Sequence, residues 1–138
     1  MATMRVRDLM TQDVIAARPD DSLARLRDMM VDRDVRHMPV IESEKDLVGL
    51  VSQRDLLRNH LIEQADVPDF IEDALLERLR VRELMTTGVV SIDPESDIRI
   101  AAQSMYENKY GCLPVVEGTR LVGILTEADF VRLMAEGN

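Results

Sequence analysis

The chain has 138 residues, 46% of them hydrophobic, which is enough for one hydrophobic core of ordinary size. Its 17 Lys and Arg residues stand against 26 Asp and Glu residues, and the net charge of −9 disfavours binding to DNA or RNA. No apolar run reaches the roughly 18 residues of a membrane span, and the first residues lack the apolar core of a secretory signal. We therefore expect a cytoplasmic protein that binds neither membranes nor nucleic-acid polymers.

The sequence contains an internal repeat. The segment VRDLMTQDVIAARPDDS, which begins at Val6, returns as VRELMTTGVVSIDPESD at Val81. After a one-residue deletion in a turn, GLVSQRD at Gly49 returns as GILTEAD at Gly123. Agreement in this order and spacing indicates a duplication. We predict a first motif over residues 1–58, a helical connector over residues 59–80 and a second motif over residues 81–138.

Both repeats predict the same elements in chain order. A short helical turn leads to a strand, and a Pro with acidic residues then starts a helix with apolar residues at helical spacing. Two apolar strands joined by a hairpin follow, and a second helix ends the repeat. The predicted strands are 14–16, 37–41 and 47–51 in the first repeat and 89–92, 112–116 and 121–125 in the second. The fold class is therefore α/β, with the order β-α-β-β-α in each repeat.

A repeat of roughly 60 residues buries little surface alone, so we expect the two to share one core about a pseudo-twofold axis. A ligand would then lie in the cleft between them. The connector starts a predicted helix at Pro68 and Asp69, with apolar residues on one side. This helix either packs on its own domain or contacts a second copy or another partner.

The segments from Gly49 and Gly123 both read Gly, two apolar residues, a hydroxyl, two residues and Asp. The pairs Ser52 with Asp55 and Thr126 with Asp129 are typical of a capping box at the start of a helix. The same geometry suits a nucleotide, because a helix N-terminus attracts phosphate and a carboxylate accepts hydrogen bonds from a ribose diol. The two interpretations are compatible and both remain open.

The duplicated pattern resembles the CBS domain family, named after cystathionine β-synthase, in its usual tandem pair (Bateman module). The resemblance covers residues 6–58 and 81–133. Its markers are the LMT opening at 9–11 and 84–86, the strand with a central proline at 37–40 and 112–115, and the two Gly-to-Asp segments.

The resemblance implies a regulatory module that senses AMP, ADP, ATP or S-adenosylmethionine and is commonly a homodimer. Asp55 and Asp129 would hold the ribose, with Ser52 and Thr126 near the ribose and phosphates. Strand residues would surround the adenine: Val14, Ile15, Met38 and Pro39, or Val89, Val90, Cys112, Leu113 and Pro114. Because nothing in this sequence is fused to the pair, a regulated partner would act in trans.

The repeats differ just before the strand proline, where only the first has charge. Arg36, with His37 in support, is the candidate for phosphate recognition, and a solvated arginine is the alternative. We expect no enzyme activity, catalytic cofactor or metal site, because the sequence lacks a phosphate-binding glycine loop, a nucleophile elbow and metal-ligand spacing. The rival function is a ligand-silent CBS pair that serves for dimerisation or partner docking.

Overall fold

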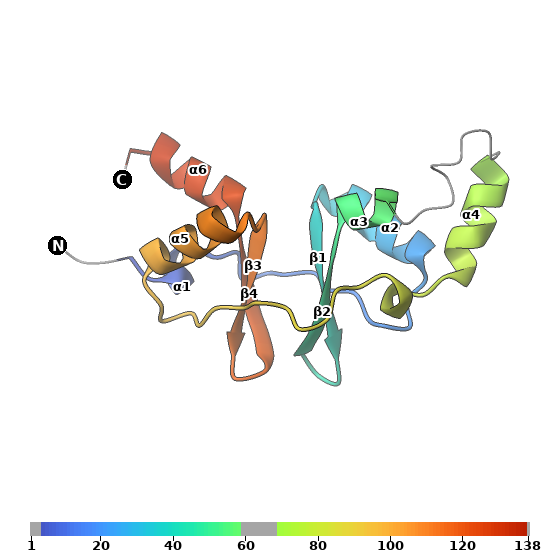
Figure 1. Ribbon diagram of the computed structural model, residues 1–138, viewed down its shortest axis with the longest axis horizontal. Coiled ribbons are helices and arrows are strands. Elements are labelled where there is room, and N and C mark those ends of the chain that lie inside the picture. The colour runs from blue at the N-terminus through green and yellow to red at the C-terminus, as the bar shows by residue number, and fades with distance from the viewer. Residues whose placement is uncertain (1–3, 59–68, 138) are drawn as a thin grey trace. The chain divides into compact units, whose positions relative to one another are not determined.

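The computed structural model describes residues 4–58 and 69–137 (Figure 1). The first repeat forms α1 (Val6–Leu9), α2 (Leu23–Arg33), β1 (His37–Glu42), β2 (Asp46–Ser52) and α3 (Gln53–Arg58). The second forms the 3-10 helix η2 (Val81–Glu83), α5 (Ile98–Asn108), β3 (Cys112–Glu117), β4 (Arg120–Thr126) and α6 (Glu127–Ala135). Helix α4 (Asp69–Arg78) lies in the connector, whose residues 59–68 fall outside the described chain.

The α/β fold class and the two hairpins are confirmed. The predicted first strands 14–16 and 89–92 do not form, and each repeat has instead one bridging residue, just after the predicted range in the first repeat and at its last position in the second. Ala17 bridges Val40 and Ile92 bridges Val115, both in parallel. The Ala17 N–H donates to the Pro39 carbonyl at 2.9 Å, and the Ala17 carbonyl accepts from the Ile41 N–H at 2.9 Å. The pairing is this short because the residues before it pack with the hairpin and helices of the other repeat.

Helices α2 and α5 begin where their sequences predict. The Ser22 side chain accepts a hydrogen bond from the Arg25 N–H at 3.0 Å, and Asp97 accepts one from the Arg99 N–H at 2.8 Å. Both caps satisfy a backbone donor that the helix itself cannot pair. The helices end at Asp34 and Lys109, with φ of 52° and 59°.

The chain folds into two compact units that do not coincide with the two repeats. Unit 1 holds the chain up to Val14, Lys45–Leu47, and the chain from Val90 on. Unit 2 holds Ile15–Glu44 and the described residues of Val48–Val89. The opening segment of each repeat therefore packs in the unit that contains the other repeat's hairpin and helices.

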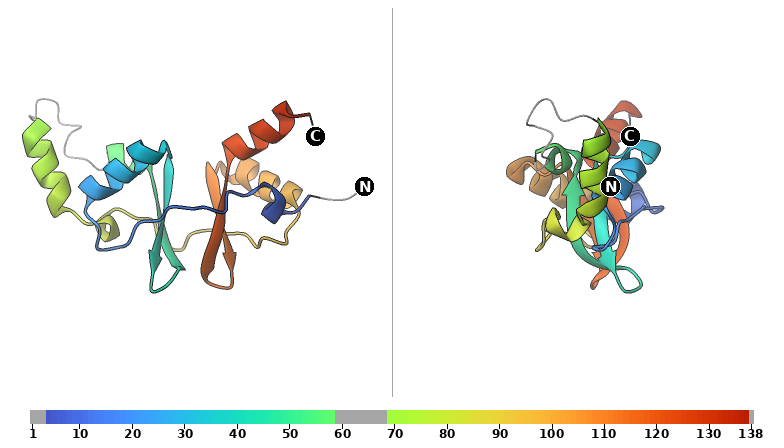
Figure 2. Two further views of the ribbon diagram at one scale, coloured as in Figure 1. Left: turned by 180° about the vertical axis from the view of Figure 1, so that it is seen from behind. Right: turned by 90° about the vertical axis from the view of Figure 1, so that its right-hand side faces the viewer.

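Each unit has its own hydrophobic cluster, whereas the sequence predicted one shared core. In unit 1 the openers Val6 and Leu9 are buried with residues of α5, β3 and β4. In unit 2 Val81 is buried with residues of α2, β1 and β2. In both units the helices α5 and α6, or α2 and α3, lie beside the hairpin (Figures 1 and 2).

Backbone hydrogen bonds hold each exchanged segment to a strand. In unit 1 Thr11 and Ile124 exchange N–H···O bonds of 2.9 and 3.0 Å. In unit 2 Thr86 and Leu50 exchange bonds of 2.9 and 3.0 Å. The residue beside each strand partner is glycine, and a methionine of the exchanged segment lies over it: Met10 over Gly123 and Met85 over Gly49.

These two glycines leave no room for a side chain. A Cβ at Gly49 would lie 2.7 Å from the Met85 Sδ and 3.1 Å from the Thr86 carbonyl oxygen. A Cβ at Gly123 would lie 2.5 Å from the Met10 Sδ and 3.0 Å from the Thr11 carbonyl oxygen. The thioether can move, but the carbonyls belong to segments held by backbone hydrogen bonds.

We predict that Gly49→Ala and Gly123→Ala each lower the free energy of unfolding by about 1–3 kcal/mol, the usual cost of overpacking. Urea denaturation measures the loss. The control introduces the same alanine into a protein whose methionine has already been shortened, as Gly49→Ala in Met85→Ala and Gly123→Ala in Met10→Ala. In that background the glycine change should cost less than it does in the wild type. An alanine that costs nothing at either position would contradict this account of the close contact.

Candidate functional site

In each unit the strand with the central proline lies next to the helix that follows the Gly-to-Asp segment. The Gln53 N–H at the start of α3 donates to the Arg36 carbonyl at 2.7 Å. The equivalent bond in unit 1 runs from the Glu127 N–H to the Gly111 carbonyl at 3.2 Å. The predicted hydroxyl and carboxylate residues therefore lie close to the entrance of β1 in unit 2 and of β3 in unit 1.

The Ser52 and Asp55 pair forms a reciprocal helix cap in unit 2. The Ser52 N–H donates to the Asp55 Oδ2 at 3.0 Å, and the Asp55 N–H donates to the Ser52 Oγ at 3.0 Å. Both side chains are half-buried. This is the capping box that the sequence left open as an alternative.

Thr126 and Asp129 make the matching cap in unit 1, in a more enclosed setting. The Thr126 N–H and Oγ1 donate to the Asp129 Oδ2 at 2.8 and 3.3 Å. Arg132 forms an ion pair with the other carboxylate oxygen at 3.3 Å. Asp129 is only 3% exposed, so Asp55 is the more accessible of the two predicted ribose carboxylates.

The residues around the strand prolines are core residues. Met38 belongs to the cluster of unit 2 and Leu113 to that of unit 1, and Pro39 and Pro114 are fully buried. Cys112 is buried as well, and this burial raises the pKa of its thiol to about 12. The thiol is therefore protonated at neutral pH and behaves as a small apolar side chain.

The four predicted first-strand residues divide between the units. Ile15 and Val90 lie in the same unit as the proline strand and Asp of their own repeat. Val14 and Val89 lie in the opposite unit, with the exchanged openers. Val90 is 47% exposed and the other three are half-buried. The segment read as one strand is thus the point at which the chain passes from one unit to the other.

The residue Arg36 is exposed and lines a hollow of about 670 Å³ in unit 2. Gln53 and Leu56 of α3 border the same hollow, which brings Arg36 to the N-terminal side of that helix. His37, the next residue, is half-buried at the start of β1.

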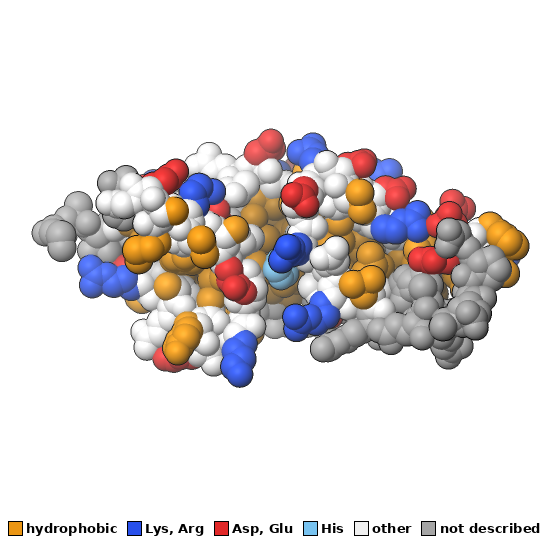
Figure 3. Space-filling view, turned by 90° about the horizontal axis from the view of Figure 1, so that it is seen from above, with side chains coloured by type: hydrophobic (Ala, Val, Ile, Leu, Met, Phe, Trp, Pro, Cys, Tyr) orange, Lys and Arg blue, Asp and Glu red, His pale blue; other side chains and the backbone are white. Residues whose placement is uncertain are grey.

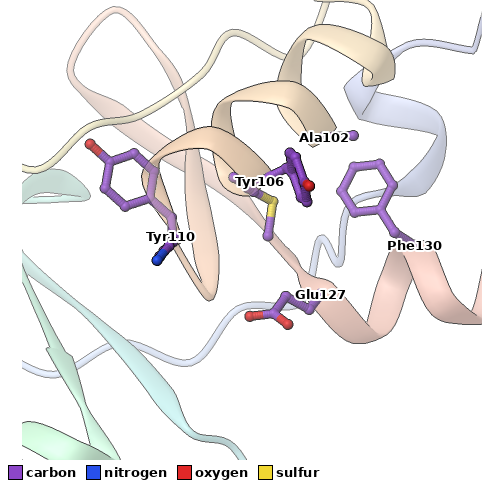
Figure 4. A pocket seen from close by; sticks show the side chains of 7 residues that line it. Ala102, Tyr106, Tyr110, Glu127 and Phe130 are labelled. Carbon is purple, nitrogen blue, oxygen red and sulfur yellow. The ribbon is translucent and has the colours of Figure 1, made fainter.

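Sequence reasoning missed a second hollow, of about 480 Å³, in unit 1. It is lined by Ala102, Met105, Tyr106, Lys109, Tyr110, Glu127 and Phe130 (Figure 4). A partial signal was present, since Ala102 and Tyr106 are four residues apart and so lie on one side of α5. We name this hollow the aromatic groove.

The described residues contain neither a membrane-spanning helix nor a cluster of metal ligands. No helix within 4–58 and 69–137 has the length and apolarity needed to cross a membrane. Over the same residues, no group of three or more His, Cys, Asp or Glu side chains is placed to hold a metal ion.

The sequence of the chain matches a known family. The CBS domain model matches residues 6–61 and again residues 81–136. The chain belongs to the CBS domain family. The two matches correspond to the two repeats, so the chain is a tandem CBS pair.

Solved CBS pairs resemble the chain over nearly its whole length. A putative acetoin utilization protein (AcuB) from Vibrio cholerae is 32% identical, with a TM-score of 0.82 over 98% of this chain and 93% of that one. CBSX2, solved in complex with AMP, is 29% identical, with a TM-score of 0.83 over 97% and 98%. The uncharacterized protein MJ1225 of Methanocaldococcus jannaschii is 28% identical over 94% of this chain, which spans only 42% of that relative.

We predict that the two Asp caps contribute to the free energy of unfolding. Asp129→Ala removes the acceptor for the Thr126 N–H and should lower the free energy of unfolding by about 0.5–2 kcal/mol, whereas Asp129→Asn keeps a side-chain oxygen and should cost less. Asp55→Ala and Asp55→Asn should follow the same order. Denaturant unfolding of the four variants measures it, and equal losses for Ala and Asn would show that the carboxylates do not act as caps.

Proposed function

We propose that this CBS pair is a regulatory module that binds an adenosine-containing nucleotide and performs no chemistry on it. The strongest support is that each unit places a hydroxyl, an Asp and a helix N-terminus beside its proline strand. Such a helix start favours phosphate, and its Asp can accept from a ribose. The likeness to CBSX2, which was solved with AMP, supports the ligand class of AMP, ADP, ATP or S-adenosylmethionine.

In this proposal Asp55 and Asp129 accept hydrogen bonds from the ribose, and Ser52 and Thr126 lie near the ribose and phosphates. The backbone and side chains around Ile15, Met38 and Pro39, or Val90, Cys112, Leu113 and Pro114, contact the adenine, with Val14 and Val89 contributing at the crossing points. The pocket that uses Asp55 is the more accessible one, because Asp129 is almost fully buried in its cap.

We further propose how ligand binding regulates a partner. A nucleotide bound to a CBS pair changes which conformations are populated, and a partner that prefers one of them responds. We place that partner in trans, propose a cytoplasmic homodimer, and propose sensing of the cell's energy state as the role if the ligand is AMP or ATP.

The second candidate function is a ligand-silent module for dimerisation or partner docking. One observation favours it specifically: the hydroxyl and carboxylate of both segments are engaged in helix caps, which gives them a structural task without any ligand. Ligand binding therefore has to be measured directly.

We predict that at least one of AMP, ADP, ATP, S-adenosylmethionine and NAD raises the melting temperature at millimolar concentration. A ligand that binds only the folded state stabilises it by RT ln(1 + [L]/Kd), and a Kd between about 1 μM and 1 mM is expected. Asn in place of Asp55 or Asp129 keeps a side-chain oxygen for the helix cap but loses the charge that would accept from the ribose. Asp55→Asn and Asp129→Asn should therefore weaken binding with little loss of stability. No shift with any of the five ligands would favour the ligand-silent module.

The candidate phosphate contact gives a sharper test. Arg36→Ala should weaken AMP or ATP binding by roughly 10- to 150-fold, the worth of one charge-assisted hydrogen bond, and leave adenosine almost unaffected. Isothermal titration calorimetry with AMP and adenosine measures both. The exposed Arg54, on α3 one residue beyond Gln53, provides a matched control as Arg54→Ala. Equal losses for the two ligands would show that Arg36 acts through folding.

A further inference from the structure

Two short segments carry the chain from one unit to the other. We name residues 11–17 the first crossing segment and their repeat equivalents, residues 86–92, the second. Each begins in the unit of the other repeat's hairpin and ends in the unit of its own. The adenine contacts proposed above include Ile15 of the first segment and Val90 of the second, so each segment takes part in a candidate site.

Backbone hydrogen bonds fix both ends of the first crossing segment. Thr11 exchanges bonds of 2.9 and 3.0 Å with Ile124, which lies two residues before Thr126. At the other end, Ala17 exchanges two bonds of 2.9 Å with β1, one of them to the Pro39 carbonyl. The segment therefore joins the strand that leads to the hydroxyl and Asp pair of unit 1 to the proline strand of unit 2.

The second crossing segment is fixed in the same way with the units reversed. Thr86 exchanges bonds of 2.9 and 3.0 Å with Leu50, which lies two residues before Ser52. The Ile92 N–H donates to the Pro114 carbonyl at 3.0 Å, and the Ile92 carbonyl accepts from β3 at 2.9 Å. Each candidate site is thus built on strands that hold one end of both crossing segments.

Between their fixed ends the crossing segments are held weakly. Neither residues 12–16 nor residues 87–91 make a backbone hydrogen bond to another residue that the structure describes. Gln12 and Asp13 are exposed, and so is Val90. Backbone that lacks such bonds and such burial retains conformational freedom, and a ligand that packs against it removes part of that freedom.

The two segments differ at the position two residues beyond their first anchor. The second segment has Gly88 there, with φ of 64°, whereas the first has Asp13, whose φ lies outside the left-handed region. Glycine has more backbone freedom than any other residue, so the second segment transmits ordering from one end to the other less completely than the first. A Cβ at Gly88 would meet no atom within 4 Å, so a side chain there changes the freedom of the backbone without a clash.

Long-range electrostatics is a weaker link between the two sites than the crossing segments. Acidic and basic side chains are interspersed over the face of the molecule in Figure 3. Exposed charges more than about 10 Å apart are also largely screened at physiological salt. The hydrogen-bonded crossing segments are therefore the route along which one site can act on the other.

We propose that the two candidate nucleotide sites bind cooperatively, because a ligand that contacts a crossing segment at one site orders the strand that the same segment holds at the other. Adenine against Ile15 would restrict the first segment, whose other end holds the strand of Thr126. Adenine against Val90 would act in the same way on the strand of Ser52. Part of the loss of conformational entropy then accompanies the first binding event, so the second is tighter.

The inference rests on the proposed function and adds its regulation, so its test begins with binding. Isothermal titration calorimetry of the wild type with AMP, ATP and S-adenosylmethionine gives the product of the two association constants. Asp55→Asn and Asp129→Asn, each with one site left, give the two constants singly. The wild-type product divided by the product of the single-site constants is the coupling factor, and we expect about 5 or more, the lower end of the usual range.

Substitutions in the crossing segments should move the coupling factor in opposite directions. Asp13→Gly loosens the first segment and should lower the factor about twofold or more, whereas Gly88→Asn restricts the second and should raise it by a similar amount, since Asn tolerates a left-handed backbone. The matched controls lie in the hairpin turns. They are Glu44→Gly, at an exposed acidic residue, and Gly118→Asn, at a glycine whose φ is also 64°, and both should leave the factor unchanged.

Hydrogen exchange tests the same link when only one site is filled. With AMP bound to Asp129→Asn, the Ile124 N–H, which donates to the Thr11 carbonyl, should exchange about 5-fold more slowly. With AMP bound to Asp55→Asn, the Leu50 N–H should respond in the same way. The Tyr110 N–H, which donates to the Met105 carbonyl within unit 1, is the control and should not change.

The outcomes separate this inference from the proposed function. Binding with a coupling factor within about twofold of one, or below one, overturns cooperativity and leaves the nucleotide-binding module standing. Unchanged exchange at Ile124 and Leu50 in the presence of bound nucleotide overturns it as well. Absence of binding by all three ligands overturns the proposed function and the inference together.

Discussion

The exchange of opening segments is the constraint on which the rest of the structure depends. Each repeat sends its first residues into the unit of the other repeat, where backbone hydrogen bonds join Thr11 to Ile124 and Thr86 to Leu50. The buried Val6 and Val81 fill the same place in the two hydrophobic clusters. Neither unit can complete its core without residues from both repeats, so we expect a half-chain to lack part of the apolar burial that stabilises a small domain.

The same constraint reaches the candidate site. Leu50, which bonds to the exchanged Thr86, lies two residues before Ser52, and Ile124 lies two residues before Thr126. The backbone that positions each hydroxyl and Asp pair is therefore held by the other repeat. A ligand that moves one of these helix starts would act on a strand that the exchanged segment also contacts, which provides a physical route from binding to a change elsewhere in the unit.

Much of this could be predicted from the sequence, because duplication, apolar runs and capping residues are local signals. The hairpins, both Gly-to-Asp caps and the start of α2 at Ser22 were found where expected. The exchange was not predictable, since Val6 and Val81 are identical and their spacing does not say on which copy they pack. The loss of the first strand follows from the exchange. The aromatic groove was missed because Tyr106 and Phe130 lie 24 positions apart, and only the fold brings α5 beside α6.

Comparison of the repeats within the chain separates what the fold requires from what is specific to each half. Glycine under a methionine occurs in both halves, and in both the backbone N–H of the hydroxyl residue donates to the Asp three residues later. The two halves differ around the hollows, where Val31 and Asp34 in one correspond to Tyr106 and Lys109 in the other. These differing side chains are exposed, so the fold places little constraint on them. A difference that costs the fold little and gathers aromatics in one hollow is most simply explained by a task that only that half performs.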